Sequence, residues 1–224
     1  MRVPSKNTRS FAGDSRGLLG RKLLQCIEVE GFSEIIVSTD DNKVIEISQS
    51  IADEAGDGRI SIVRRPADLA KSGTLDDFVS YAASLRNEGV LFWTHVTSPF
   101  FNAQKMNYAL QAYEAHVEHG HYDSLMGVTK IHDFFWRRGK CISHDRSVDK
   151  WPQTQDIEPF FEVNSSVFMM EIGMMRAQND RVGSNPFLFE MDKRSGFDVD
   201  WPEDFELAEL MHHSDQLRQR EHAF

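Results

Sequence analysis

The sequence has few cysteines, no long apolar run and no excess of positive charge. Cys26 and Cys141 are its only cysteines among 224 residues, and their separation fits neither a metal-binding motif nor a disulfide framework. It contains no run of about 18 apolar residues, the length that a membrane-spanning helix requires. Residues 1–6 lack the apolar segment of a secretory signal. We therefore expect a cytoplasmic protein that does not span a membrane.

The charge balance is strongly acidic, with a formal net charge of −10. Such a balance argues against the basic surface of a nucleic-acid-binding protein and against attraction to anionic membranes. Neither nucleic acid nor membrane is therefore an expected partner. The hydrophobic content of 40% is enough for one full core, so we expect a single domain over residues 1–224.

Apolar residues alternate between helical spacing and short β-branched runs along much of the chain. Helices are predicted over 18–29, 44–55, 76–87 and 103–116, and strands within 34–41, 60–63, 90–93 and 166–170. This order is typical of a doubly wound α/β fold with a mostly parallel sheet. Ligands of such sheets bind beyond the carboxyl ends of the strands, where polar residues follow the apolar runs here.

The Asp198-Val199-Asp200 motif is the most informative feature near the C-terminus. On a strand, the two carboxylates would face the same way and Val199 would face the interior. Two adjacent carboxylates suit Mg²⁺ with phosphate oxygens completing its shell. The alternative is structural, because Pro202 suits the first position of a helix, and Asp200 could simply stand beside a helix start.

The stretch from 131 to 162 breaks the regular alternation and is rich in aromatic residues, including Trp136 and Phe160. It predicts a segment that leaves the sheet. Two interpretations are open: an arm that packs on a second copy of the chain, or a long aromatic loop folded over its own domain.

Seven motifs, taken in order, resemble the acylneuraminate cytidylyltransferases, also called CMP-N-acetylneuraminic acid synthetases. They cover nearly the whole chain: Val3-Pro4-Ser5-Lys6-Asn7, Phe11-Ala12-Gly13, Ile36-Val37-Ser38-Thr39-Asp40-Asp41, Arg65-Pro66-Ala67-Asp68-Leu69-Ala70, Thr97-Ser98-Pro99, Asn164-Ser165 and Asp198-Val199-Asp200-Trp201-Pro202-Glu203-Asp204. The resemblance implies a Rossmann-like nucleotidyltransferase fold, with residues at about 130–162 forming a dimerisation arm.

The activity implied by the resemblance is transfer of CMP from CTP to a sialic-acid-like nine-carbon 2-keto sugar acid, with release of pyrophosphate. The sugar's anomeric hydroxyl attacks the α-phosphorus, so no covalent protein nucleophile is needed, and Mg²⁺ and cationic side chains stabilise the phosphates. A homodimer is implied as well.

The resemblance also assigns roles to individual residues of this sequence. These are Lys6, Asp198 and Asp200 in catalysis; Asp198 and Asp200 as metal ligands; Arg2, Lys6, Asn7, Arg65 and Thr74 in nucleotide binding; and His95, Thr97, Ser98, Gln155 and Asn164 in sugar binding.

Several positions depart from the family pattern. His95 stands where the family has a glutamine that helps to recognise the sugar. Thr154 stands where the family has an arginine of the arm, and Arg137, Arg138 or Arg146 could supply the missing positive charge. Residues 72–76 differ from the family's run at the cytosine site. These changes favour a relative of sialic acid, or an altered keto sugar, as the substrate.

The family also has a first strand and a phosphate loop ahead of the Val3-Pro4 step. We expect that the natural chain starts upstream of Met1, because the sheet needs that strand. The alternative is a protein that has lost half of its nucleotide loop. Two other functions stay open: a metal-dependent glycosyltransferase with an Asp-x-Asp motif, and a catalytically silent nucleotide-binding or assembly subunit.

Overall fold

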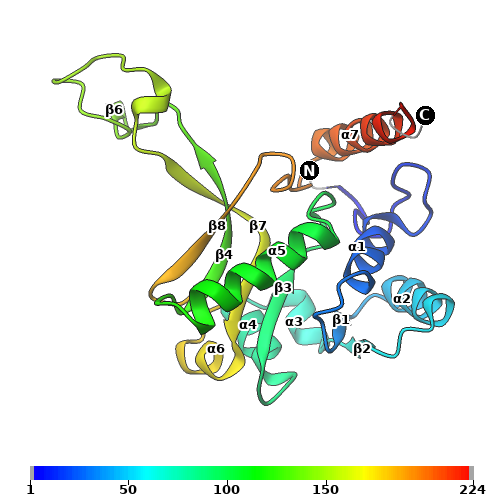
Figure 1. Ribbon diagram of the computed structural model, residues 1–224. Helices are drawn as coiled ribbons and strands as arrows, with labels where there is room; N and C mark the ends of the chain where they lie inside the picture. Colours follow the sequence, from blue (N-terminus) through cyan, green and yellow to red (C-terminus); the bar gives the residue numbers. More distant parts are fainter. Residues whose placement is uncertain (1–2, 222–224) are drawn as a thin grey trace.

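The computed structural model describes residues 3–221, in which two sheets carry helices on both faces (Figure 1). The helices are α1 Gly17–Ile27, α2 Asn42–Ala55, α3 Ala67–Ser72, α4 Leu75–Ser84, α5 Ala103–Tyr113, α6 Ile172–Gln178 and α7 Pro202–Glu221. The strands are β1 Ile35–Thr39, β2 Ile60–Arg64, β3 Val90–Thr94, β4 Ser124–Ile131, β5 Trp136–Arg137, β6 Lys140–Cys141, β7 Phe160–Glu171 and β8 Pro186–Met191.

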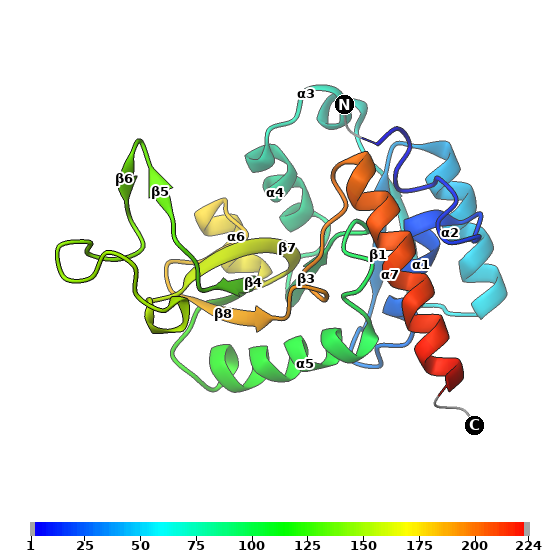
Figure 2. The same ribbon diagram turned by 90° about the horizontal axis from the view of Figure 1, so that it is seen from above.

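The larger sheet has the strand order β3-β7-β4-β8, and the smaller one pairs β1 with β2. The β1–β2 and β4–β8 pairs are parallel, while β7 runs antiparallel to both of its neighbours. Figure 2 shows α5 on one face of the larger sheet and α4 with α6 on the other. This arrangement confirms the doubly wound α/β class predicted from the sequence.

The main core lies between the sheets and helices α1 and α5. Phe101, Met106, Leu125 and Met169 are at most 1% exposed and belong to one apolar cluster. Cores of this density lose about 2–5 kcal/mol of unfolding free energy when a large buried side chain is cut back to alanine. This core fixes the carboxyl ends of the strands, where the candidate site lies.

The segment between β4 and β7 forms an arm that projects from the body (Figure 1). Its base is the pairing of Ile131 with Phe160, and its tip holds the short hairpin of β5 and β6. Trp136 and Trp151 are 48% and 62% exposed, and the Arg146 guanidinium lies over both rings. The predicted excursion is therefore present, while its role in self-association stays a prediction.

Among residues 3–221, no helix combines the length and the apolar character that crossing a bilayer demands.

Candidate functional site

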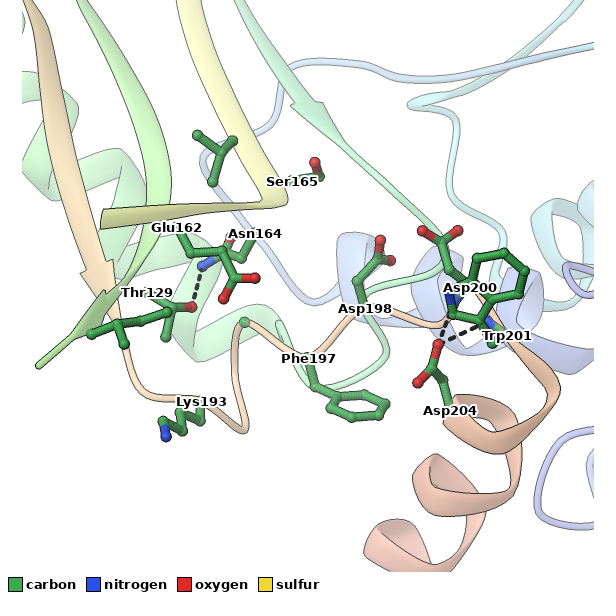
Figure 3. A pocket seen from close by; sticks show the side chains of 13 residues that line it. Thr129, Glu162, Asn164, Ser165, Lys193, Phe197, Asp198, Asp200, Trp201 and Asp204 are labelled. Carbon is green, nitrogen blue, oxygen red and sulfur yellow. Dashed lines mark hydrogen bonds between the residues drawn. The ribbon is translucent and has the colours of Figure 1, made fainter. Parts of the chain in front are cut away.

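The Asp198-Val199-Asp200 segment runs along the edge of the fold without belonging to a strand. The predicted strand is therefore wrong, but the predicted facing is correct. Val199 is 0% exposed and its backbone N–H donates to the Thr97 carbonyl at 2.9 Å. Figure 3 shows the Asp198 and Asp200 carboxylates on the same side of the segment. Burial of Val199 thus imposes the alternation that strand pairing would otherwise impose.

The start of α7 is capped by Asp204, not by the Asp200 side chain. The Asp204 Oδ2 atom accepts hydrogen bonds from the backbone N–H groups of Asp200 at 3.0 Å and Trp201 at 2.8 Å (Figure 3). Such a contact satisfies donors that a helix start otherwise leaves unpaired. The structural explanation for Asp200 therefore accounts for its backbone and not for its carboxylate.

Lys6 brings a positive charge to this carboxylate from the other end of the sequence. Its Nζ atom donates to Asp200 Oδ1 at 2.9 Å and to the Val199 carbonyl at 2.8 Å. The Lys6 side chain is 21% exposed and that of Asp200 48%. An ion pair this open contributes only about 0–1 kcal/mol to stability, so its value lies in placing charge.

Asp198 is the more buried of the two carboxylates, and burial raises its pKa above the ordinary value. The negative charge of Asp200 raises it further, while a hydrogen bond from the Thr97 side chain and the charge of Lys6 act in the opposite direction. The folded protein therefore carries excess negative charge here, which a further cation would stabilise.

Asp198 and Asp200 are acidic side chains that a metal ion could meet at this place. Over residues 3–221, no group of three or more His, Cys, Asp and Glu side chains is placed to hold one. Two carboxylates are nevertheless the protein ligands expected at a Mg²⁺ site whose other ligands are phosphate oxygens and water. The residues fit Mg²⁺ bound together with a phosphate substrate.

A cavity of about 610 Å³ opens beside the pair (Figure 3). Asn164 lines it from β7, and its Nδ2 atom donates to Thr129 Oγ1 at 3.1 Å while its Oδ1 accepts from the Ser166 backbone. The register between β4 and β7 shifts at this point, and Ser165 adopts a φ of +57°. Such bulges redirect side chains next to sites, and this one turns Asn164 toward the cavity.

A larger cavity of about 1380 Å³ extends from the other side and includes Asn7, Arg65 and His95 in its lining. The Arg65 Nη2 atom donates to the Ser38 carbonyl, and its guanidinium lies over the Phe78 ring at 5.2 Å. Arg65 Nε and Asn7 Oδ1 are buried and have no hydrogen-bond partner within residues 3–221. Buried polar atoms of this kind are expected to meet a ligand or water.

His95 lines the larger cavity and has an unusually low pKa. Burial lowers its pKa to about 4, and the cations Arg181, Lys6 and Lys22 add to the effect, while Asp200 opposes it. Its Nε2 atom is 3.4 Å from Arg181 Nη1. His95 is therefore neutral at pH 7. Because the Val199 backbone N–H donates to the carbonyl of Thr97, two residues after His95, the carboxylate pair and the larger cavity lie close together.

We expect His95 to make the protein sensitive to acid between pH 6.5 and about 4. In this window an unfolded His95 binds a proton and the folded one does not, so stability falls as pH falls. Relative to His95→Gln, the wild-type chain should lose about 3 kcal/mol of unfolding free energy across the window.

Urea unfolding of both proteins at several pH values measures this difference. Asp198 titrates with the opposite sign, but it is present in both proteins, and the comparison removes its contribution. Parallel pH profiles would show that the fold does not lower the pKa of His95.

The structure does not bring all predicted site residues together. Thr74 caps α4, where its hydroxyl and Asp77 form reciprocal hydrogen bonds. Ser98 is 0% exposed and lines neither cavity, and Gln155 lies exposed on the arm. Arg2 lies outside the described residues. Lys6, Asn7, Arg65, His95, Thr97, Asn164, Asp198 and Asp200 do gather around the two cavities.

Arg181 was not identified from the sequence. It follows α6 in a loop, and its guanidinium lies 3.8 Å from the centre of the Phe168 ring and 5.4 Å from that of Trp93. Burial lowers its pKa, although Asp180 partly opposes this. Because its aromatic platform comes from two strands far apart in sequence, no local motif could have indicated it.

No family model and no curated protein matches the sequence. Solved structures do share its fold. A CMP:2-keto-3-deoxy-manno-octonic acid synthetase complexed with CTP matches with a TM-score of 0.63 at 13% identity, covering 96% of this chain and 94% of that one. A 4-diphosphocytidyl-2C-methyl-D-erythritol synthase matches at 0.60 and 11%, covering 92% and 94%. HddC from Yersinia pseudotuberculosis matches at 0.52 and 10%, covering 94% and 90%.

Proposed function

We propose that the chain is a cytidylyltransferase that transfers CMP from CTP to the anomeric hydroxyl of a sialic-acid-like nine-carbon 2-keto sugar acid and releases pyrophosphate. The observation that carries the proposal is the cluster of Lys6, Asp198 and Asp200 where two cavities approach each other. The shared fold with a synthetase complexed with CTP supports it. The motif resemblance to acylneuraminate cytidylyltransferases supports the sugar acid in particular.

The reaction requires positioning and charge more than covalent chemistry. A bond forms between the sugar oxygen and the α-phosphorus, and the bond from that phosphorus to the pyrophosphate oxygen breaks. Lys6 supplies a positive charge beside the carboxylates, where it can contact phosphate oxygens. Asp198 and Asp200 would hold Mg²⁺, and the bound ion would neutralise negative charge on the phosphates of CTP.

The larger cavity is the proposed nucleotide side. Asn7 and Arg65 each present a buried polar atom without a partner among the described residues, and both line this cavity. A nucleotide offers donors and acceptors to both. Thr74, at the start of α4, and Arg2, beyond the described residues, remain predicted contacts to the nucleotide.

The smaller cavity is the proposed sugar side, with Asn164 and Lys193 in its wall. A 2-keto sugar acid carries a carboxylate that needs a cation, and we propose Lys193 of this cavity for it, together with Arg181, which lines the neighbouring larger cavity. His95 lines the larger cavity next to this one and is neutral at pH 7, so we propose that it contacts the sugar by hydrogen bonding and not by charge. A homodimer would let the exposed arm and its Gln155 reach the site of a second copy.

Incubation with CTP, Mg²⁺ and a panel of eight- and nine-carbon 2-keto sugar acids tests the function. We expect pyrophosphate release that depends on both CTP and a nine-carbon acid. Consumption of a nucleotide sugar without pyrophosphate release would favour the glycosyltransferase alternative. CTP binding without turnover of any acid would favour a silent nucleotide-binding subunit.

A further inference from the structure

Residues 5–16, which we call the Lys6 segment, contain no helix and no strand of either sheet. Ser5 and Ala12 adopt positive φ angles of +48° and +50°, and Gly13 one of +87°. Residues other than glycine keep such a conformation only where the surrounding structure imposes it. The position of Lys6 therefore depends on the contacts that hold this segment.

Helix α7 holds the Lys6 segment at Ala12. The Ala12 backbone N–H donates to Glu209 Oε1 at 2.8 Å, although the two residues are 197 positions apart. Figure 2 shows α7 beside the N-terminal part of the chain. A carboxylate acceptor makes such a hydrogen bond roughly twice as strong as a neutral one does. Glu209 is therefore a strong anchor for this segment.

Aromatic contacts lie next to this hydrogen bond. Phe205 stands four residues before Glu209, so the two side chains share a face of α7. Phe205 is 1% exposed and Phe11 3%, and their rings meet edge to face with 5.6 Å between the centroids. The Arg9 guanidinium lies over the Phe205 ring at 4.9 Å. One face of α7 therefore seats residues 9–12 of the Lys6 segment.

A tight turn connects these residues to Lys6. The backbone N–H groups of Thr8 and Arg9 donate to the Ser5 carbonyl at 2.9 and 2.8 Å, which closes a turn with Lys6 inside it. The Lys6 Nζ atom then contacts Asp200 Oδ1 at 2.9 Å, just ahead of the start of α7. The Lys6 segment is thus tied to α7 and to the residues before it at two separate places.

We propose that Glu209 is a positioning residue for Lys6: by holding the Ala12 amide, it keeps the Lys6 ammonium beside the carboxylate pair. The inference rests on the proposed function, in which Lys6 acts on a substrate phosphate. Glu209 lines neither cavity, so it acts through the Lys6 segment and not by contact with a substrate. Glu209 supplies the acceptor that fixes the segment, and Lys6 supplies the charge.

Substitutions of Glu209 test the proposal in the pyrophosphate assay. Glu209→Ala leaves the Ala12 amide without its acceptor and should lower the rate at least about tenfold, because small displacements of a positioned group are costly. Glu209→Gln keeps a side-chain oxygen at the same reach and should stay within about twofold of the wild-type rate. Glu206→Ala, at an exposed position of the same helix, is the matched control and should change nothing. An equal loss in Glu209→Gln and Glu209→Ala would overturn the proposal.

A double-mutant cycle separates the positioning of Lys6 from a general structural role. If Glu209 acts through Lys6, Glu209→Ala should cost nothing further in a chain that already carries Lys6→Met. Losses that multiply in the double variant would overturn the proposal. Glu209→Asp, whose carboxylate is one methylene shorter, repeats the test with the charge kept and should resemble Glu209→Ala. Thermal unfolding of every variant checks that rates are measured on folded protein.

Two measurements on the chain alone do not depend on turnover. Hydrogen exchange of the Ala12 amide should speed up at least about tenfold in Glu209→Ala and stay unchanged in Glu209→Gln. Trace acetylation by acetic anhydride should label Lys6 about two- to fivefold faster in Glu209→Ala, relative to the exposed Lys150, because the displaced ammonium loses its ion pair.

The acetylation result keeps this proposal separate from the proposed function. Unchanged labelling of Lys6 in Glu209→Ala would overturn the positioning role even if the rate falls. A wild-type chain that releases no pyrophosphate with any sugar acid would contradict the proposed function alone. The labelling of Lys6 would then still decide whether Glu209 positions it.

Discussion

Asp198→Asn should lower the rate of pyrophosphate release by about 1000-fold or more, with no loss of stability. The substitution keeps the shape of the side chain and removes the buried negative charge beside Asp200. Removal of one preorganised charged group from a transition-state site costs about 10²–10³-fold, and loss of a metal ligand adds to this.

The free energy of unfolding of Asp198→Asn should not fall along with the rate. A carboxyl whose folded pKa is raised contributes stability at low pH that is lost as pH rises through the folded pKa. Asparagine does not titrate, so at pH 8 Asp198→Asn should be as stable as the wild-type chain or more so. Thermal unfolding between pH 4 and 8, together with steady-state kinetics, measures both effects.

The exposed Asp53 on α2 provides the matched control for this experiment. Asp53→Asn makes the same chemical change far from the cavities and should alter neither rate nor stability measurably. If Asp198→Asn stays active and unfolds more easily, Asp198 has a structural role and the proposed site is wrong.

The sequence predicted the elements that carry strong local periodicity. Helix α2 and strand β2 appear within a few residues of the predicted bounds, because their apolar spacing agrees with their burial in the fold. Strands β4 and β8 were not predicted. β4 contains Gly127 in mid-strand and β8 begins at Pro186, and both features read locally as turns. Their pairing with each other and with β7 overrides that local preference.

The site was predictable where a motif carries it and not where the fold assembles it. The Asp198-x-Asp200 spacing indicated a shared facing, which burial of Val199 supplies. The contact of Lys6 with Asp200 joins residues 194 positions apart, and only the resemblance to a family placed them together. Arg181 belongs to no motif, since its position depends on aromatic rings from β3 and β7.

Lys6→Met is the second substitution with a large expected effect, about 100-fold or more on the rate of pyrophosphate release. The Lys6 ammonium sits 2.9 Å from Asp200 Oδ1, where it can balance the carboxylates and contact a substrate phosphate. Methionine keeps a similar length without charge. The CTP dissociation constant should rise along with the fall in rate.

Stability separates this role from a structural one. The ion pair is partly exposed and contributes at most about 1 kcal/mol, so Lys6→Met should unfold almost as the wild-type chain does at pH 7. Because Lys6 lowers the pKa of Asp198, its removal should raise that pKa further. The stability of Lys6→Met should therefore continue to fall up to a higher pH than that of the wild-type chain.

Lys6→Arg is the conservative comparison. It keeps the positive charge but replaces a compact ammonium with a planar fork, so it should recover part of the rate lost in Lys6→Met and restore the wild-type pH profile of stability. Kinetics and thermal unfolding of the wild-type chain, Lys6→Met and Lys6→Arg under identical conditions measure the rate and the stability of each protein. A Lys6→Met variant that keeps more than about a tenth of the wild-type rate would contradict the 100-fold loss expected from a preorganised cation. In that case the positive charge that acts on the phosphates would have to come from Arg181 or Lys193 across the cavities.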